Sequence, residues 1–169
     1  EIAPSWPVDT RVQVADVNGD SRADVILSAS EGEGRVAWFE APAAAAPGNW
    51  IEHSVTSEAL TGVHSLRAAD FDLDGDVDVL VAEMHTSPRK RVLLLVNDGG
   101  HWRVLPLAQH GSHNMVAGDV DRDGDVDLVG KNYGGAGRFV EYWENRSADL
   151  RLVPSVGPPA VASEWRYDP

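Results

Sequence analysis

The strongest chemical signal in this 169-residue chain is the spacing of its aspartates. The pattern D-x-[D/N]-x-D-x-x-x-D occurs three times, at residues 16–24, 70–78 and 119–127. So many carboxylates within one short loop repel one another at neutral pH unless a cation neutralises them. Oxygen donors in a flexible loop are the ligands that Ca²⁺ prefers, whereas Mg²⁺ demands stricter octahedral geometry. The pattern therefore predicts three Ca²⁺ sites, one in each repeat.

The order of residues within each loop predicts how the ion is held. Side chains at loop positions 1, 3 and 5 should converge, and a turn at position 6 should bring in the carbonyl of position 7. Gly75 and Gly124 fill position 6, where positive φ is expected, but Ser21 stands there in the first loop. The aspartate at position 9 is expected to close the shell as a bidentate ligand. The predicted ligands are Asp16, Asn18, Asp20, Arg22 and Asp24; Asp70, Asp72, Asp74, Asp76 and Asp78; and Asp119, Asp121, Asp123, Asp125 and Asp127, with Arg22, Asp76 and Asp125 supplying carbonyls.

The sequences beside the loops indicate strands. An EF-hand would need a glutamate at position 12 and flanking helices, but position 12 is apolar or glycine in all three loops. The flanks are short apolar runs at 25–27, 77–81 and 126–129, typical of β-strands. Asp/Gly-rich turns also occur without an ion, but three copies in one register favour ion sites. The first loop, with Asn18 and Ser21, is predicted to be the weakest.

The repeat extends beyond the loops. A further predicted strand follows each loop, at 35–40, 91–97 and 139–145, and Trp50 and Trp102 occupy similar places after the first two. The pattern thus predicts four antiparallel strands in each unit, which is the content of one propeller blade. The expected fold class is all-β. A single repeat domain (1–169) should hold blades at 11–55, 61–107 and 110–153, and an extended tail at 157–169.

With these features the chain resembles the FG-GAP/VCBS repeat family, the calcium-binding blades of integrin α-subunit heads and many bacterial surface proteins. The resemblance rests on Asp-Phe-Asp-Leu-Asp-Gly-Asp-Val-Asp-Val-Leu at 70–80 and Asp-Val-Asp-Arg-Asp-Gly-Asp-Val-Asp-Leu-Val at 119–129, together with the strands Trp-Phe-Glu and Tyr-Trp-Glu-Asn. It covers residues 11–153 and implies Ca²⁺ on the loop that joins the two innermost strands of each blade. Propellers usually need four or more blades to close. The chain is therefore expected to be a partial propeller or one completed by oligomerisation.

Composition narrows the range of partners and compartments. A formal charge of −13 argues against nucleic acid, for which a basic surface is expected. No apolar run is long enough to span a bilayer, and the absence of cysteine excludes disulfides and thiolate metal sites. Loose calcium sites suit the millimolar calcium found outside cells. We therefore expect an extracellular location, either secreted or at the cell surface.

A second group of candidate residues lies away from the loops. His64 and His113 each stand six residues before the first aspartate of a loop. This places them at the start of an innermost strand, at the channel end opposite the calcium. Histidine can bind metals or exchange protons, and lysine attracts carboxylates. The predicted ligand-binding residues are His64, His113, Lys131 and Asn132, with Arg67, Glu83 and His85 nearby; the alternative is that the two histidines only cap their strands.

The motifs predict a binding role. No nucleophile motif such as G-x-S-x-G is present. The favoured hypothesis is a non-catalytic scaffold for a protein or glycan ligand. One alternative is a structural subunit that assembles into a ring or filament through its open blade ends, because unpaired sheet surfaces promote association. Another is an accessory or catalytic part of a polysaccharide-degrading enzyme.

Overall fold

The computed structural model describes residues 1–6, 9–43, 48–134 and 139–147, and the backbone of 165–168. Within these ranges the regular elements are all β-strands. They form three four-stranded antiparallel sheets and one short two-stranded sheet. The expected all-β fold of four-stranded blades is therefore confirmed, and the blades do not close into a ring.

The blades follow one another along the chain. The first contains β1 (Thr10–Ala15), β2 (Asp24–Ala29), β4 (Val36–Glu40) and β5 (Ile51–Ser54). The second contains β7 (Val63–Ala69), β8 (Asp78–Glu83), β9 (Val92–Asp98) and β10 (His101–Ala108). The third contains β11 (Asn114–Gly118), β12 (Asp127–Lys131), β13 (Val140–Asn145) and β14 (Trp165–Asp168). Between the first two blades, β3 (Glu33–Gly34) pairs with β6 (Leu60–Thr61).

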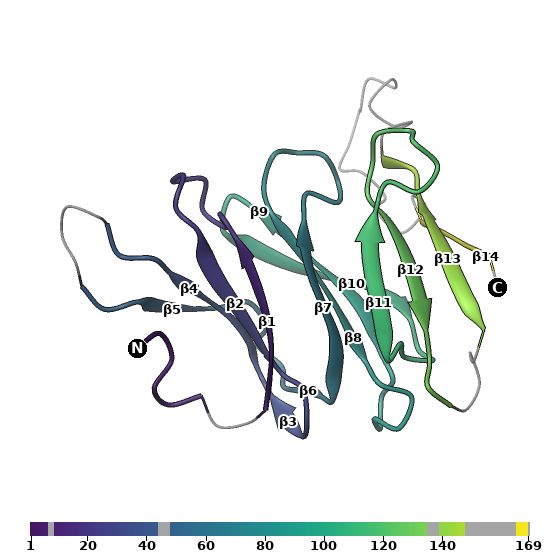
Figure 1. The fold of residues 1–169 in the computed structure, drawn as a ribbon, viewed down its shortest axis with the longest axis horizontal. Helices are drawn as coiled ribbons and strands as arrows, with labels where there is room; N and C mark the ends of the chain where they lie inside the picture. The colour runs from purple at the N-terminus through teal and green to yellow at the C-terminus, as the bar shows by residue number, and fades with distance from the viewer. Residues whose placement is uncertain (7–8, 44–47, 135–138, 148–164, 169) are drawn as a thin grey trace.

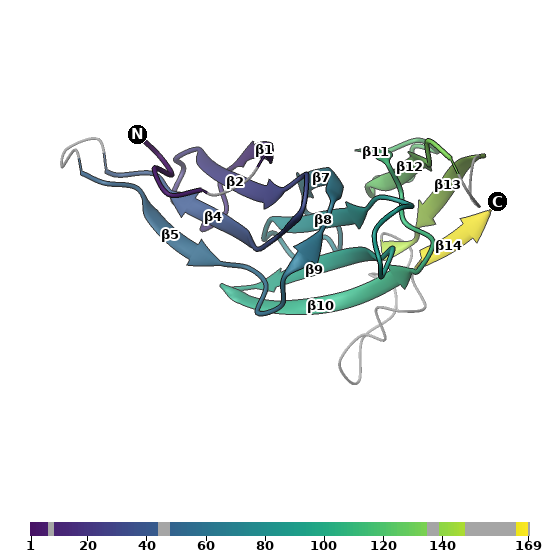
Figure 2. The same ribbon diagram turned by 90° about the horizontal axis from the view of Figure 1, so that it is seen from below.

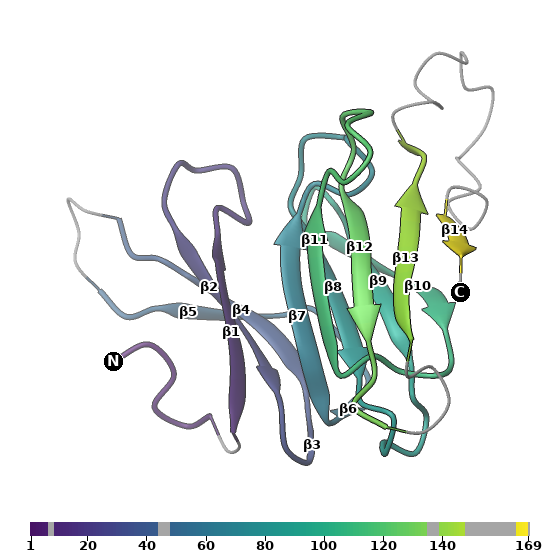
Figure 3. The same ribbon diagram turned by 45° about the vertical axis from the view of Figure 1, so that its right-hand side comes forward.

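The register places every aspartate loop at the same point of its blade. Asp24 pairs with Ala15, Asp78 with Ala69, and Asp127 with Gly118. Each loop therefore joins the first two strands of a blade, closing the hairpin where the pairing ends. The innermost strands β1, β7 and β11 run side by side, and all three loops lie at the same edge of the molecule (Figures 1 and 3).

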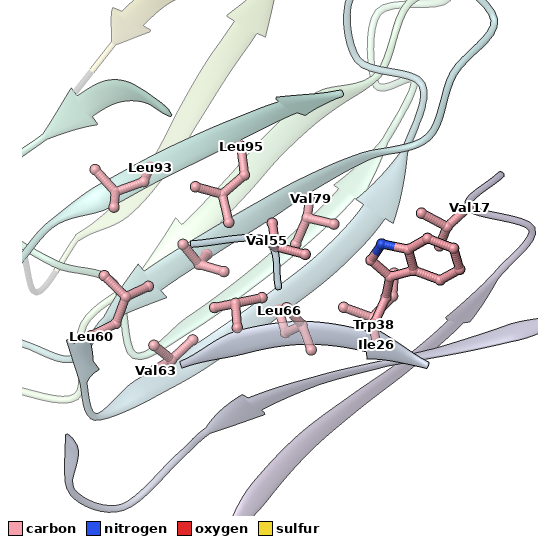
Figure 4. Close-up of a cluster of buried hydrophobic side chains, with 12 residues drawn as sticks. Val17, Ile26, Trp38, Val55, Leu60, Val63, Leu66, Val79, Leu93 and Leu95 are labelled. Carbon is pink, nitrogen blue, oxygen red and sulfur yellow. The ribbon is translucent and has the colours of Figure 1, made fainter. Parts of the chain in front are cut away.

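Apolar residues between the sheets hold the blades together, and seen from below the sheets lie one beside the next (Figure 2). The second blade has a neighbour on each face, so every residue of β8 is buried. A cluster between the first and second blades includes Ile26, Trp38, Leu66 and Leu95 (Figure 4). A second cluster joins the second and third blades, with Phe71, Leu80, Met115, Leu128 and Trp143 among its members.

The two outer blades each leave an apolar face open. On β1, Val12 and Val14 are 54% and 61% exposed, whereas Leu66, at the position of β7 equivalent to Val12, is 1% exposed. On the third blade, Val116 and Val120 are 50% and 55% exposed. A third apolar cluster, in which Trp6 packs edge-on against Phe39, covers part of the first blade's outer face.

The C-terminal segment contributes a strand to the third blade. Within the expected tail at 157–169, residues 165–168 form β14, which pairs antiparallel with β13. The rest of that tail and the predicted end of the third blade at 148–153 lie outside the described residues. The described part of the chain contains no helix with the length and apolar character needed to cross a bilayer.

Candidate metal centres

Carboxylates converge in the second and third loops. Ligand oxygens of Asp70, Asp72 and Asp78 all lie within 4.8 Å of one another. The same holds at the equivalent positions 1, 3 and 9 of the third loop, which are Asp119, Asp121 and Asp127. The first loop has an amide, Asn18, at position 3, so only two carboxylates remain at these three positions.

A ladder of side-chain acceptors shapes each loop. Asn18, Asp72 and Asp121 at position 3 each accept the backbone N–H of position 5. The aspartate at position 5 in turn accepts the N–H of position 7. Such Asx turns fold the chain tightly around its own side chains. The carboxylates of Asp74 and Asp123 at position 5 do not belong to the converging triads and serve this turn.

Two positions of every loop adopt positive φ. At position 6 the φ values of Gly75 and Gly124 are 104° and 99°, while Ser21 adopts 67°. Position 4 is also left-handed in each loop, with Gly19 at 73°, Leu73 at 62° and Arg122 at 68°. The left-handed helical region near 60° tolerates a side chain at a cost, but values near 100° favour glycine. The glycine of the first loop thus stands at position 4, whereas that of the other two loops stands at position 6.

The aspartate at position 9 anchors each loop to its blade. Asp24, Asp78 and Asp127 are fully buried. One oxygen of each accepts the N–H of loop position 2, at 2.9–3.0 Å. The other accepts an N–H at the end of the third strand, at 2.8–2.9 Å. Sequence reasoning assigned this carboxylate only to the ion, but both of its oxygens also bind the backbone.

The local electrostatics show how much negative charge the second loop concentrates. Burial, followed by the charge of Asp74, raises the pKa of Asp72 to about 6. Burial raises the pKa of Asp78 to about 7, with Asp72 and Asp74 adding to the rise. Beside the third loop, burial and the neighbouring Asp127 raise the pKa of Tyr142 on β13, whose hydroxyl donates to Asp127. A divalent cation would offset this repulsion, and the all-oxygen donor set suits a hard ion.

The first loop carries a cation of its own. The guanidinium of Arg22, at position 7, forms an ion pair with Asp20 and lies 3.6 Å from Glu40. Its Nε also donates to the carbonyl of Ala41 at 3.1 Å. Aspartate fills position 7 in the other two loops, and Asp76 accepts the N–H of Gly99 there. Arg22 thus neutralises part of the charge that an ion would otherwise balance.

Two buried asparagines connect the loops of adjacent blades. The Nδ2 of Asn97 donates to the carbonyls of Val17 in the first loop and Val77 in its own loop, both at 3.3 Å. The Nδ2 of Asn145 does the same one blade later, donating to Phe71 at 2.7 Å and Val126 at 3.2 Å. We call this contact the asparagine bridge. Sequence analysis missed it, although the recurrence of Asn at the end of the third strand was a usable signal.

The predicted ligand-binding residues come together only in part. His64 on β7 and His113 just before β11 have ring centroids 4.4 Å apart, and His64 Nε2 lies 3.0 Å from Glu31 Oε1. Burial, then the neighbouring His64, lowers the pKa of His113. Lys131 is exposed, whereas the buried Asn132 donates to the carbonyls of His110 and Gly111 and holds that turn.

The other residues named near this site differ in role. Glu83 is buried and accepts from Arg91 and from the N–H of Thr61, so it is a structural ion-pair partner. Arg67 donates to the carbonyl of Leu66. The ring of His85 lies 6.4 Å from that of Tyr133. A hollow of about 400 Å³ is lined by His113, Asn114, Lys131, Asn132 and Tyr133.

Comparison with known families agrees with this architecture. The family described as FG-GAP-like repeat matches residues 16–81 and 70–130, which together span more than half of the chain. The chain therefore belongs to the FG-GAP-like repeat family. Among curated proteins, none matched the sequence.

The asparagine bridge yields a stability prediction. Asn97→Ala removes the donor to one buried and one partly buried carbonyl and the acceptor of the Gly100 N–H. Buried groups left without partners are costly, so the free energy of unfolding should fall by about 2–4 kcal/mol. Urea unfolding measures the loss. As a control, Asn114→Ala on the exposed start of β11 should change it by about 0.5 kcal/mol or less. Similar losses for both variants would show that the bridge has no special role.

The raised carboxyl pKa values predict an unusual pH dependence without metal. A folded-state pKa raised above the unfolded value contributes stability at low pH, which is lost as pH rises through the folded pKa. For Asp72 and Asp78 this loss ends near pH 6 and 7. Asp72→Asn, which copies Asn18 of the first loop, should therefore raise the melting temperature in chelator at neutral pH. It should have little effect near pH 4. A lower melting temperature for Asp72→Asn in chelator at neutral pH would contradict the repulsion.

Proposed function

We propose that this chain is a calcium-stabilised propeller module that acts outside the cell as a non-catalytic scaffold for a protein or glycan ligand. The observation that carries the proposal is the convergence of three carboxylates in each of two equivalent loops. Oxygen donors in this arrangement suit Ca²⁺, and a third ion is proposed for the first loop, where Asn18 replaces one carboxylate. Weak calcium sites that fill at millimolar calcium favour the extracellular location.

The ions would fix the edge of the molecule where the blades meet. Each loop is tied to its own blade by the aspartate at position 9, and two of the loops are tied to the next blade by an asparagine bridge. An ion in a loop therefore stabilises the contact between blades as well as the loop. At the opposite edge, His113 and Lys131 line the hollow described above, which we propose as a ligand contact, with Asn132 positioning its wall.

Removing calcium tests the proposal. Because ligand binding to the folded state alone adds stability, excess chelator should lower the melting temperature by about 10 °C or more. Asp121→Asn should reproduce part of that loss in calcium. Asp98→Asn, at an exposed aspartate outside the loops, should leave the calcium effect unchanged. Calorimetry should detect calcium binding directly. A melting temperature that does not respond to calcium or chelator would refute structural calcium.

The open faces of the first and third blades favour a second candidate, a subunit that assembles through its blade ends. Val12 on β1 and Val120 in the third loop are at positions that pack against a neighbouring blade elsewhere in the molecule, where Leu66 and Phe71 are buried. If copies pair through these faces, light scattering should give a multiple of the single-chain mass. Val12→Asp should reduce it to one chain, whereas Val104→Asp on the exposed outer strand β10 should not. A single-chain mass for the unaltered protein would contradict this candidate.

A further inference from the structure

A cavity lies between the first and second blades, at the edge that carries the aspartate loops. Its volume is about 530 Å³, within the range of small-molecule sites. The first blade contributes Trp38, Glu52 and His53, and the second contributes Trp102 and Asp76. Asn18 of the first loop completes the wall. This cavity is separate from the hollow beside His113, which lies at the other end of the blades.

One wall of the cavity is a rigid aromatic stack. The ring of His53 lies on Trp38, with centroids 4.2 Å apart and planes 12° from parallel. Trp38 is 8% exposed and belongs to the core between the blades, beside Val17 (Figure 4). The Nε2 of His53 lies 2.9 Å from Glu40 Oε2, which fixes the ring from its edge. The half-exposed Trp102 adds a second flat apolar surface.

This wall departs from the repeat. Trp38 and His53 are cross-strand partners on β4 and β5. The equivalent partners in the second blade, Leu94 on β9 and Leu105 on β10, are both apolar and pack in the core between the second and third blades. The second junction therefore packs without a stacked pair at this position, and its own imidazole and aromatic rings, His110 and Trp143, lie 5.9 Å apart and are tilted by 50°. The near-parallel stack is found only at the first junction among the described residues, where it offers a flat wall to a ring-shaped ligand in the cavity.

The polar groups around the cavity define the ligand's chemistry. Asn18 supplies an amide, and Asp76 and Glu52 supply carboxylates from opposite blades. Asp76 also accepts the Gly99 N–H at 2.8 Å, and Glu52 accepts from Arg35, so both carboxylates are held in place. Flat rings bury apolar faces, and fixed acceptors bind hydroxyl groups. Arg35 compensates the charge of Glu52, so Asp76 is the carboxylate that disfavours an anionic ligand. An uncharged sugar has both an apolar ring face and many hydroxyl donors.

We propose that the cavity between the first and second blades binds an uncharged sugar ring, which stacks on His53 and Trp102, donates a hydroxyl hydrogen bond to Asp76 and accepts one from the amide NH2 of Asn18. This inference rests on the proposed binding-scaffold function and adds a glycan site to it. Asn18 and Asp76 come from two different aspartate loops. The conformations of both loops therefore shape the site.

Titration of the calcium-loaded protein with methyl glucoside, methyl galactoside and methyl mannoside, followed by tryptophan fluorescence and calorimetry, tests the inference. At least one should bind saturably, and glucuronate should bind more weakly. Trp102→Ala and His53→Ala should each weaken binding by about tenfold, because each removes a stacking surface. Trp50→Ala is the matched control, since Trp50 has a similar place on the first blade but packs in the third cluster away from the cavity.

The outcomes separate this inference from the proposed function. Failure of all three sugars to bind the unaltered protein would overturn the inference, as would binding that Trp102→Ala and His53→Ala leave unchanged. Glucuronate binding as tightly as the uncharged sugars would overturn the assignment of the ligand class. None of these results alters the melting response to calcium, which tests the scaffold itself. The melting temperature of each variant in calcium confirms that a loss of binding is not a loss of fold.

Discussion

The buried aspartate at the end of each loop is the interaction on which the rest of the structure depends. A carboxylate removed from water is stable only when hydrogen bonds or a cation compensate it. Asp78 has two backbone N–H donors, one from its own loop and one from the end of the third strand. It therefore joins three strands of the blade at one point. The raised pKa of Asp78 shows that these two donors do not fully offset its burial, which leaves a role for a cation.

The asparagine bridge extends this constraint from one blade to the next. Asn97 lies near the end of β9, the third strand of the second blade, where its backbone N–H binds Asp78 while its side chain reaches Val17 of the preceding loop. One residue therefore links two loops. At the equivalent position of the first blade stands Ala41, which keeps the backbone contact to Asp24 but has no amide to offer another blade. The conformation of the loops and the packing of the blades are therefore coupled where the first blade meets the second and where the second meets the third.

The sequence predicted the repeated elements well because each follows from a local pattern. Aspartate spacing located the loops, and apolar runs beside them located strands such as β8 and β12. What it missed depends on contacts between distant residues. The ion pair between Arg22 and Asp20 follows from the side-chain direction within a turn, and the role of Asn132 depends on a facing loop. Left-handed backbone at position 4 was also missed, since Leu73 and Arg122 are residue types that rarely adopt it.

Differences between repeats are more informative about function than the repeats themselves. Features shared by the blades, such as the position-9 aspartate, are explained by the need to fold a blade. Arg22 has no counterpart in the other loops, and its guanidinium lies near Glu40, which in turn contacts His53. A chain of charged side chains therefore runs from the first loop to the stack on Trp38.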